Sequence, residues 1–422
     1  MKKMEMRGSA FRALGLIIPI LFAVFVSFPS VVLAQDKEAP RFRLGGLEIH
    51  PEIEVSVEND SNIFLTKSGT KDDTIYRYVP EINLKVPFGA ESSLEGGFKY
   101  EIIDFDSYDG EDTENKTATA ALNLERIDGI VYSRTNGTWE NTSDPSSSEQ
   151  QSTTGARTPR TKGEVDSKLG YGGYDDSRFL VEANLGATTE RYNRDSNRRL
   201  ENDRFRTGAM VEIKYSKKTS LRFEYDFEKT EYDNRTVSDQ RDDNKDHAFR
   251  AGLSFSPSAL ISGHATFGAE VRRFDDSLST TDTRDRDQES FSADVDLTWE
   301  ARPSRTTVNV VFAAGIENAT SPGQFGYNKW NVDGTLTQGL MFINDNLEAS
   351  LNVSFEQNSF LRSNREDDTF KFGADIKYTA PNKRYPWFAA FNFDIKKKST
   401  NENKSSVEYR DNIFLFKVGL VY

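Results

Sequence analysis

The chain has 422 residues, of which 12% are aromatic and 29% are charged, and it has no cysteine. Its mean hydropathy of -0.65 excludes a bundle of transmembrane helices, because such a protein needs long apolar segments. The formal net charge of -13 argues against nucleic acid as a partner, since phosphates require a basic surface. The 30 Phe and 16 Tyr residues exclude a solvated, disordered chain.

The first 34 residues have the pattern of a secretory signal peptide. Basic residues precede an apolar stretch at 14–28, and Val32-Leu33-Ala34 provides a cleavage pattern before Gln35. An uncleaved anchor helix is the alternative, and prolines within the apolar stretch disfavour it. We therefore predict a signal peptide at 1–34, a short periplasmic segment at 35–46 and one domain at 47–422. Without cysteine, neither a lipid anchor nor disulfides are available.

From Leu47 onward, apolar and polar residues alternate in segments of about ten residues. In one segment Leu221, Phe223 and Tyr225 alternate with Arg222 and Glu224. Because successive side chains of a strand point to opposite faces, one face is apolar and the other is ionised.

Eighteen such segments are found. They lie at 47–57, 75–86, 92–103, 116–124, 129–139, 162–171, 179–188, 206–216, 220–230, 247–256, 261–274, 290–299, 306–317, 328–338, 347–357, 368–378, 386–395 and 408–422. The connections after odd-numbered segments are long and polar, and those after even-numbered segments are mostly short. This alternation indicates an up-and-down barrel across a bilayer, with both termini in the periplasm, rather than a soluble sandwich.

The predicted fold is therefore all-β: a transmembrane, antiparallel, up-and-down β-barrel of about 18 strands (16–18) in the outer membrane of a Gram-negative bacterium. A sheet can cross hydrocarbon only by closing on itself, because each unpaired backbone group there costs several kcal/mol. A lumen of this width holds water or a plug, which accounts for an ionised inner face.

The alternation also predicts which charged side chains face the lumen. The candidate pore-lining residues are Glu52, Glu54, Arg222, Glu224, Asp226, Arg250, Glu270, Arg272, Asp294, Asp296, Lys371, Asp375 and Lys377. Two interpretations stay open: an electrostatic filter, and solvated charges that pair across the inner wall. On the assigned faces we expect arginine to be damaging at Phe223 and tolerated at Glu224.

All four tryptophans fall near predicted strand ends. Trp139 and Trp330 are assigned to an aromatic girdle at the outer rim, and Trp299 and Trp387 to a girdle at the inner rim. The chain ends on Tyr422, with Leu420 and Val418 at alternating positions before it. This ending resembles the signal by which the barrel-assembly machinery recognises its substrates.

Motifs for chemistry are weak. His50, His247 and His264 lie on different strands without metal-ligand spacing, so we expect no metal site, no cofactor and no catalytic residues. The acidic segment 104–112 departs from calcium-loop spacing, and a solvated loop is the simpler interpretation. We therefore expect a protein that is not an enzyme.

The first hairpin carries a family resemblance. Asn59-Asp60-Ser61-Asn62 and Val79-Pro80-Glu81-Ile82 resemble the opening of the Putative beta-barrel porin 2 family. The resemblance implies an outer-membrane component of capsule or exopolysaccharide export, with periplasmic export proteins as partners and no catalytic residues. The long segment at 142–161 departs from the family pattern.

Three functions follow from these observations. The leading prediction is a passive conduit for polysaccharide export. A general diffusion porin for small solutes and ions is the alternative, and a structural or adhesive surface barrel is the third. Besides possible export proteins, the expected partners are outer-membrane lipid and the barrel-assembly machinery, and no nucleic acid.

Overall fold

A computed structural model provides the structure of the chain. It describes residues 42–88, 92–127, 131–145, 157–172, 177–233, 243–256, 259–275, 287–302, 306–319, 326–340, 343–344, 346–361, 363–381, 386–402 and 407–421. The predicted signal peptide and most of the segment at 35–46 lie outside these residues, so both stay predictions.

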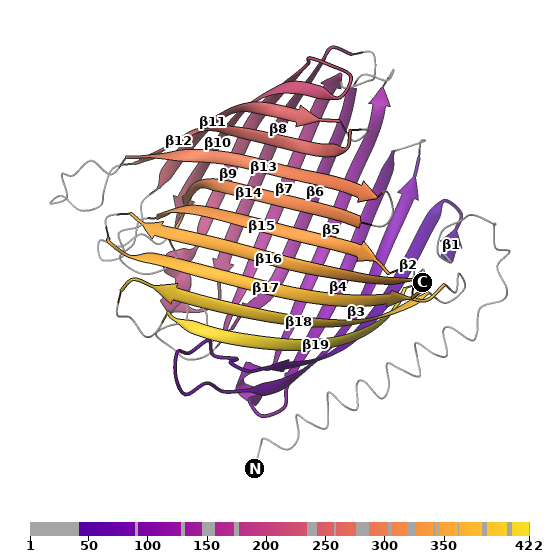
Figure 1. The fold of residues 1–422 in the computed structure, drawn as a ribbon, viewed down its shortest axis with the longest axis vertical. Helices are drawn as coiled ribbons and strands as arrows, with labels where there is room; N and C mark the ends of the chain where they lie inside the picture. Colours follow the sequence, from indigo (N-terminus) through magenta and orange to yellow (C-terminus); the bar gives the residue numbers. More distant parts are fainter. Residues whose placement is uncertain are drawn as a thin grey trace. The chain divides into compact units, whose positions relative to one another are not determined.

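The described residues are almost entirely strand (Figure 1). The strands are β1 (Phe42–Leu44), β2 (Leu47–Asp60), β3 (Asp73–Pro87), β4 (Ser93–Phe105), β5 (Thr113–Ile127), β6 (Val131–Asp144), β7 (Thr158–Gly172), β8 (Phe179–Tyr192), β9 (Asn202–Lys214), β10 (Thr219–Tyr232), β11 (Asn244–Phe255), β12 (Ile261–Phe274), β13 (Gln288–Arg302), β14 (Thr306–Glu317), β15 (Tyr327–Gly339), β16 (Leu347–Phe360), β17 (Glu366–Thr379), β18 (Trp387–Thr400) and β19 (Tyr409–Val421). Two short 3-10 helices, η1 (Asp109–Glu111) and η3 (Asp195–Leu200), lie in connections. Within the described part of the chain, no helix has the length and apolar content that a membrane crossing requires.

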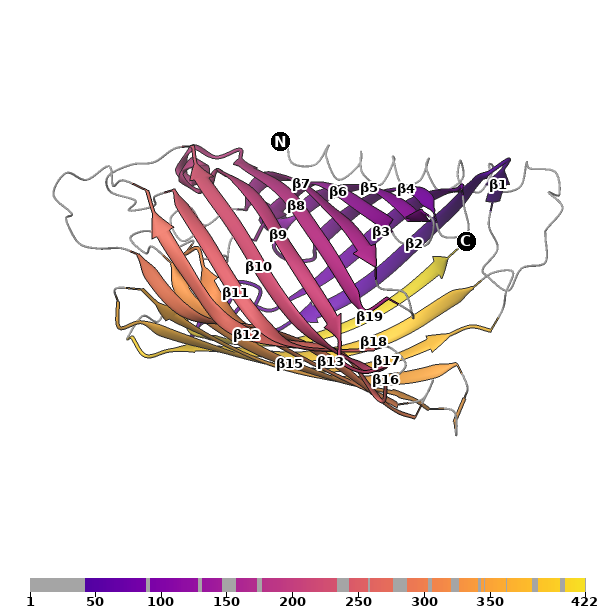
Figure 2. The same ribbon diagram turned by 90° about the horizontal axis from the view of Figure 1, so that it is seen from above.

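The sheet closes on itself. Each strand from β2 to β18 pairs antiparallel with the next one, and β19 returns to pair with β2 from Ile413 opposite Asp60 to Val421 opposite Glu52 (Figure 2). Strands β2 to β19 therefore form a closed barrel of eighteen strands. The predicted fold is confirmed.

The loop between β2 and β3 is hydrogen-bonded to β19, the strand that closes the barrel. The side-chain amide of Asn62, which is fully buried, donates to the carbonyls of Thr66 and Arg410, both at 2.8 Å. The backbone N–H of Ser61 donates to the carbonyl of Asn412 at 3.1 Å. Because Arg410 and Asn412 belong to β19, the loop after β2 is bound to the last strand.

Each of the eighteen predicted strands is present, and most observed strands are longer. The added residues lie mainly at the ends next to long connections, for example 58–60 of β2 and 396–400 of β18. These ends are polar. The alternation of apolar and polar residues therefore stops before the backbone pairing of the strand does. The sequence also gave no sign of β1, which pairs with the beginning of β2.

The two faces of the wall differ as predicted. Apolar side chains point outward and are largely exposed; Phe223 is 46% exposed, Phe391 46% and Leu185 55%. The outward surface matches the hydrocarbon of a bilayer, so the barrel contacts membrane lipid. Ionised side chains occupy the alternate positions, on the inner face.

A pair of substitutions at adjacent positions of β16 tests this assignment. Val353 is 46% exposed on the outer face, whereas Asn352 faces the lumen beside Gly373 and Thr335. Val353→Arg is expected to lower the free energy of unfolding in lipid vesicles by about 2 to 4 kcal/mol, because it places a charge in hydrocarbon. Asn352→Arg, measured by the same urea titration, should change it little. Equal losses from both variants would show that the faces are assigned incorrectly.

Candidate functional site: the charged inner wall

The candidate pore-lining residues fall into two groups on the inner wall. The larger group occupies neighbouring strands: Arg222, Glu224 and Asp226 on β10, Arg250 on β11, Glu270 and Arg272 on β12, and Asp294 and Asp296 on β13. The smaller group has Glu52 and Glu54 on β2 and Lys371, Asp375 and Lys377 on β17. Strands β18 and β19 separate these two strands. The structure therefore brings the candidates together within each group.

Glu224 is the centre of the larger group. Its carboxylate accepts hydrogen bonds from Nε of Arg222 at 2.5 Å, Nε of Arg250 at 3.0 Å and Oγ1 of Thr266 at 3.1 Å. Arg250 also contacts Asp226. Only 7% of the Glu224 side chain is exposed. A charged hydrogen bond is stronger than a neutral one, and three of them, from β10, β11 and β12, hold this carboxylate in place.

Arg272 holds the rim of the wall together. Its guanidinium bonds both carboxylate oxygens of Asp246, at 2.7 and 2.6 Å, and is 1% exposed. It also donates to the carbonyl of Ile316 at 3.2 Å, while the Glu270 carboxylate accepts the Ile316 N–H at 3.1 Å. The β13–β14 ladder extends toward this rim only as far as Ala314. Side chains of β12 thus bond the backbone of β14 beyond the end of the ladder.

His264 lies beside two carboxylates of the same group. Its Nε2 is 3.2 Å from Asp294, and ligand atoms of His264, Asp294 and Glu224 all lie within 4.8 Å of one another. This arrangement could hold a metal ion by geometry. However, Arg222 and Arg250 both bond Glu224, and their charges oppose a cation there. Asp296, the next inward acid on β13, accepts from the amide of Asn309 at 2.8 Å.

The smaller group faces a cavity of about 460 Å³. Glu52, Glu54, Asp375 and Lys377 line it together with Lys417 of β19. Lys371 lies farther along β17, opposite Lys396 of β18. The sequence of β2 contains several acids and no Lys or Arg, so this part of the wall combines an acidic strand with lysines from its neighbours.

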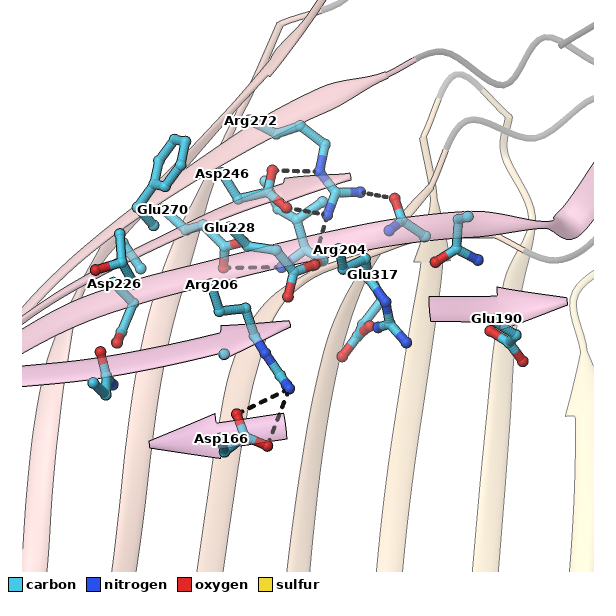
Figure 3. Close-up of a pocket in the computed structure, with 18 of the residues that line it drawn as sticks. Asp166, Glu190, Arg204, Arg206, Asp226, Glu228, Asp246, Glu270, Arg272 and Glu317 are labelled. Carbon is cyan, nitrogen blue, oxygen red and sulfur yellow. Dashed lines mark hydrogen bonds and ion pairs between the residues drawn. The ribbon is translucent and has the colours of Figure 1, made fainter. Parts of the chain in front are cut away.

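A larger cavity of about 730 Å³ is lined by strands β7 to β12 and the end of β14 (Figure 3). It includes Asp226, Arg250, Glu270 and Arg272 of the candidate set. It also includes charged residues that the sequence reading did not single out: Arg160, Asp166, Lys168, Glu190, Arg204, Arg206, Glu228, Asp246 and Glu317. Most of these residues occupy the alternate positions that face inward on their strands. The same alternation could therefore have predicted that they line the lumen.

Small inward residues make room for this cavity. At Gly186, an added Cβ would lie 2.5 Å from a carboxylate oxygen of Asp166 and 3.1 Å from Nε of Arg206. Ala248 occupies the position between Asp226 and Glu270 in the cross-strand row. Because the neighbouring charged chains fold over these small residues, space remains in front of the wall.

The tryptophans lie near strand ends. Trp139, Trp299 and Trp387 are 41%, 45% and 39% exposed on the outer face. Trp330 donates from Nε1 to Gln357 at 2.8 Å and packs against Phe355, with ring centroids 5.1 Å apart. Trp139 and Trp330 lie toward the rim with the long connections, and the other two lie toward the opposite rim.

The predicted insertion signal is described in part. Val418 and Leu420 point outward and are 38% and 41% exposed. Tyr422 lies outside the described residues. The outward parity is therefore present at the two described positions, and recognition by the assembly machinery stays a prediction.

At the long-loop rim, acidic side chains of the connections bond to other residues of the rim. Asp112, in the acidic segment 104–112, accepts the backbone N–H of Phe105 at 2.9 Å, and Glu111 pairs with Arg157 at 3.3 Å. Burial lowers the pKa of Arg157, although Glu111 opposes this effect. In another connection, a hydrogen bond from Lys67 lowers the pKa of Glu408. These contacts fix the rim. That the segment 104–112 is a loop without calcium stays a prediction.

Comparison with known families identifies this barrel. The sequence profile of the Putative beta-barrel porin 2 family matches residues 39–420, which is nearly the whole chain. The chain therefore belongs to this family, in agreement with the resemblance in its first hairpin. It is an outer-membrane β-barrel porin of a Gram-negative bacterium. Family and fold indicate a channel rather than an enzyme.

Solved bacterial structures are similar to this chain at very low sequence identity. OpdL of Pseudomonas aeruginosa is 8% identical, with 90% of this chain and 99% of that chain covered and a TM-score of 0.46. A BenF-like porin of Pseudomonas fluorescens Pf-5 is 10% identical, with 90% and 100% covered and a TM-score of 0.48. OccAB4 of Acinetobacter baumannii is 9% identical, with 89% and 98% covered and a TM-score of 0.48. A search of curated protein sequences finds no match.

The contacts of Glu224 change one expectation from the sequence. Glu224→Arg would place a third guanidinium beside Arg222 and Arg250, so we expect it to lower the free energy of unfolding by about 2 to 3 kcal/mol. Asp333→Arg is the matched control, because Asp333 is an inward acid that accepts from the amide of Asn331. Its loss should be smaller in the same urea titration. Equal stability of the two variants would contradict the central role of Glu224.

Proposed function

We propose that the barrel is a diffusion pore for small hydrophilic solutes and ions, with a modest preference for cations. The observation that carries this proposal is the inner wall, where ionised side chains pair with neighbours along the wall. Arg250 bonds Glu224 and Asp226 on the adjacent strand, and Arg206 of β9 bonds Glu164 and Asp166 of β7. Pairing along the wall leaves the middle of a wide lumen to water.

The charge of the wall supports the preference for cations. Strand β2 presents Glu52, Glu54 and Glu58 to the lumen without a basic residue of its own, and β13 presents Asp294 and Asp296. Some of these acids have basic partners, such as Arg77 for Glu58 at 2.5 Å. Rings and stripes of acids attract cations into a pore. The net charge of -13 for the chain has the same sign.

Export of polysaccharide, implied by the family resemblance, draws no support from the wall or from the family description. A sugar chain slides over exposed aromatic rings, whereas three inward rings near the long-loop rim are buried. Phe105, Tyr192 and Phe360 are 8%, 4% and 7% exposed. We therefore place the small-solute pore first and keep export as an outcome of the deletion experiment.

Partners follow from this assignment. We propose that the barrel-assembly machinery inserts the chain, with the outward Val418 and Leu420 in the recognised strand. A diffusion pore requires no periplasmic export protein, because solutes move down their own gradient. Such a protein would be needed only if the cargo were a polymer.

Reversal potentials in planar bilayers test the selectivity. In a KCl gradient the purified protein should conduct steadily and favour potassium over chloride. The double variant Glu52→Gln/Glu54→Gln should lower the cation-to-anion permeability ratio, because it removes two acids that attract cations. The decrease should be only on the order of twofold, because salt screens charges in the lumen. Asp104→Asn is the control, since Asp104 is exposed on the outer face opposite Tyr76. A ratio that fell equally in both variants would disprove a role for the β2 acids.

A deletion strain separates the three functions. Slower uptake of small solutes with normal surface glycan is the expected result. Loss of surface glycan with unchanged solute uptake would instead establish the export conduit. A purified barrel without conductance, in a strain normal in both respects, would establish a structural or adhesive barrel.

A further inference from the structure

The large cavity lined by β7 to β12 and the end of β14 contains charged side chains of both signs, and many of them pair with each other. Arg160 bonds Glu190 at 2.6 Å, and Arg206 lies 3.1 Å from Asp166. Arg250 pairs with Asp226, and Arg272 with Asp246. These pairs neutralise one another, so they give the cavity no net preference for an anion or a cation.

Other charges in the cavity form no close ion pair, although Arg204 and Glu228 interact at longer range. Among the residues that the structure describes, neither Arg204 nor Lys168 has a carboxylate within 4.0 Å, and neither Glu228 nor Glu317 has a basic group at that distance. Arg204 also has a buried Nε without an acceptor. Glu228 accepts only a long hydrogen bond, 3.5 Å, from Thr230.

Unpaired groups of both signs face the same space. Arg204 lies near the beginning of β9, Glu228 near the end of the adjacent β10 and Glu317 at the end of β14 (Figure 3). All three strand ends lie toward the long-loop rim. The charges therefore occur near the mouth that a solute from that side enters.

A solute with a single charge would leave part of this set without a partner. An anion would pair with Arg204 and be repelled by Glu228 and Glu317, and a cation would have the opposite conflict. Arg204 and Glu228 are half-buried and Glu317 is exposed. A half-buried charge without a close partner is costly, and charge-assisted hydrogen bonds are the strong ones. A small molecule with both a carboxylate and an ammonium group satisfies both kinds of group. The cavity volume of about 730 Å³ is in the range of small-molecule sites.

We propose that this cavity is a binding site for small zwitterions, in which Arg204 binds the carboxylate and Glu228 and Glu317 bind the ammonium group. The proposal rests on the pore function proposed above, because solutes must enter the lumen to reach the cavity. It names the class of solute that the pore retains and passes. A brief stop at such a site raises the local concentration of this class at the mouth.

Three probes of similar size test the charge pattern on the wild-type protein. γ-Aminobutyrate carries both groups, butyrate carries only the carboxylate, and butylammonium carries only the ammonium. In single-channel recordings γ-aminobutyrate should cause saturable interruptions of the current at concentrations at least about tenfold lower than either of the others, because it forms both charged contacts.

Variants of the cavity assign the contacts. Arg204→Gln should raise the half-saturating concentration of γ-aminobutyrate about tenfold, and Arg204→Lys should recover part of the loss. The double variant Glu228→Gln/Glu317→Gln should weaken γ-aminobutyrate and leave butyrate at least as effective. Arg134→Gln is the control, because Arg134 faces the lumen on β6 outside this cavity.

The outcomes distinguish the two proposals. Steady conductance with equal effects of the three probes would overturn the zwitterion site and leave the pore intact. Absence of conductance would overturn both. If Arg204→Gln failed to fold, the wild-type ranking and the double acid variant would still decide, because the site requires γ-aminobutyrate to rank first.

Discussion

The structure depends on one constraint: a strand in hydrocarbon must have its backbone N–H and C=O groups paired within the protein. The pairing of β19 with β2 meets this constraint, because it removes the last free edges of an eighteen-stranded sheet. Closure also decides the chemistry of the two faces. The outside must be apolar to contact lipid, and the inside is too wide to be filled by side chains, so it is wet and tolerates charge. Buried Asn62 bonds this junction to the first loop, which suggests that closure and the rim are stabilised together.

Charge on the inner wall is organised by register rather than by position along the chain. Glu224 meets Arg250 because β10 and β11 place them opposite each other, and Arg206 reaches Asp166 across an intervening glycine on β8. Such pairs stabilise the wall without closing the lumen. Arg204, Glu228 and Glu317 are not part of such close pairs. The same wall thus contains a part that supports the barrel and a part that is available to a solute.

Much of the fold could be read from the sequence, and less of the site. Alternation of the kind seen at Leu221 to Phe227 located all eighteen strands, because lipid outside and water inside impose a two-residue period. The polar ends of β2 and β18 were missed, since outside the membrane that contrast disappears. Inward parity correctly grouped Arg222, Glu224 and Arg250 on one face. Their contacts could not be predicted, because those depend on how neighbouring strands are staggered. For this reason the alternation alone predicts that arginine is tolerated at Glu224, whereas the contacts of Glu224 lead us to expect damage.

The end of β14 has a consequence for how the mouth behaves. Beyond Ala314 this strand leaves β13, and the amide and carbonyl of Ile316 are bonded by Glu270 and Arg272 instead of by a neighbouring backbone. Two side chains thus substitute for a ladder at this point of the circumference. A ladder separates only when many bonds break together, whereas this junction would part if two side chains changed rotamer. Beside the cavity the two strands are therefore joined by side chains, so the width of the entrance depends on Glu270 and Arg272, while the paired ladders below do not depend on them.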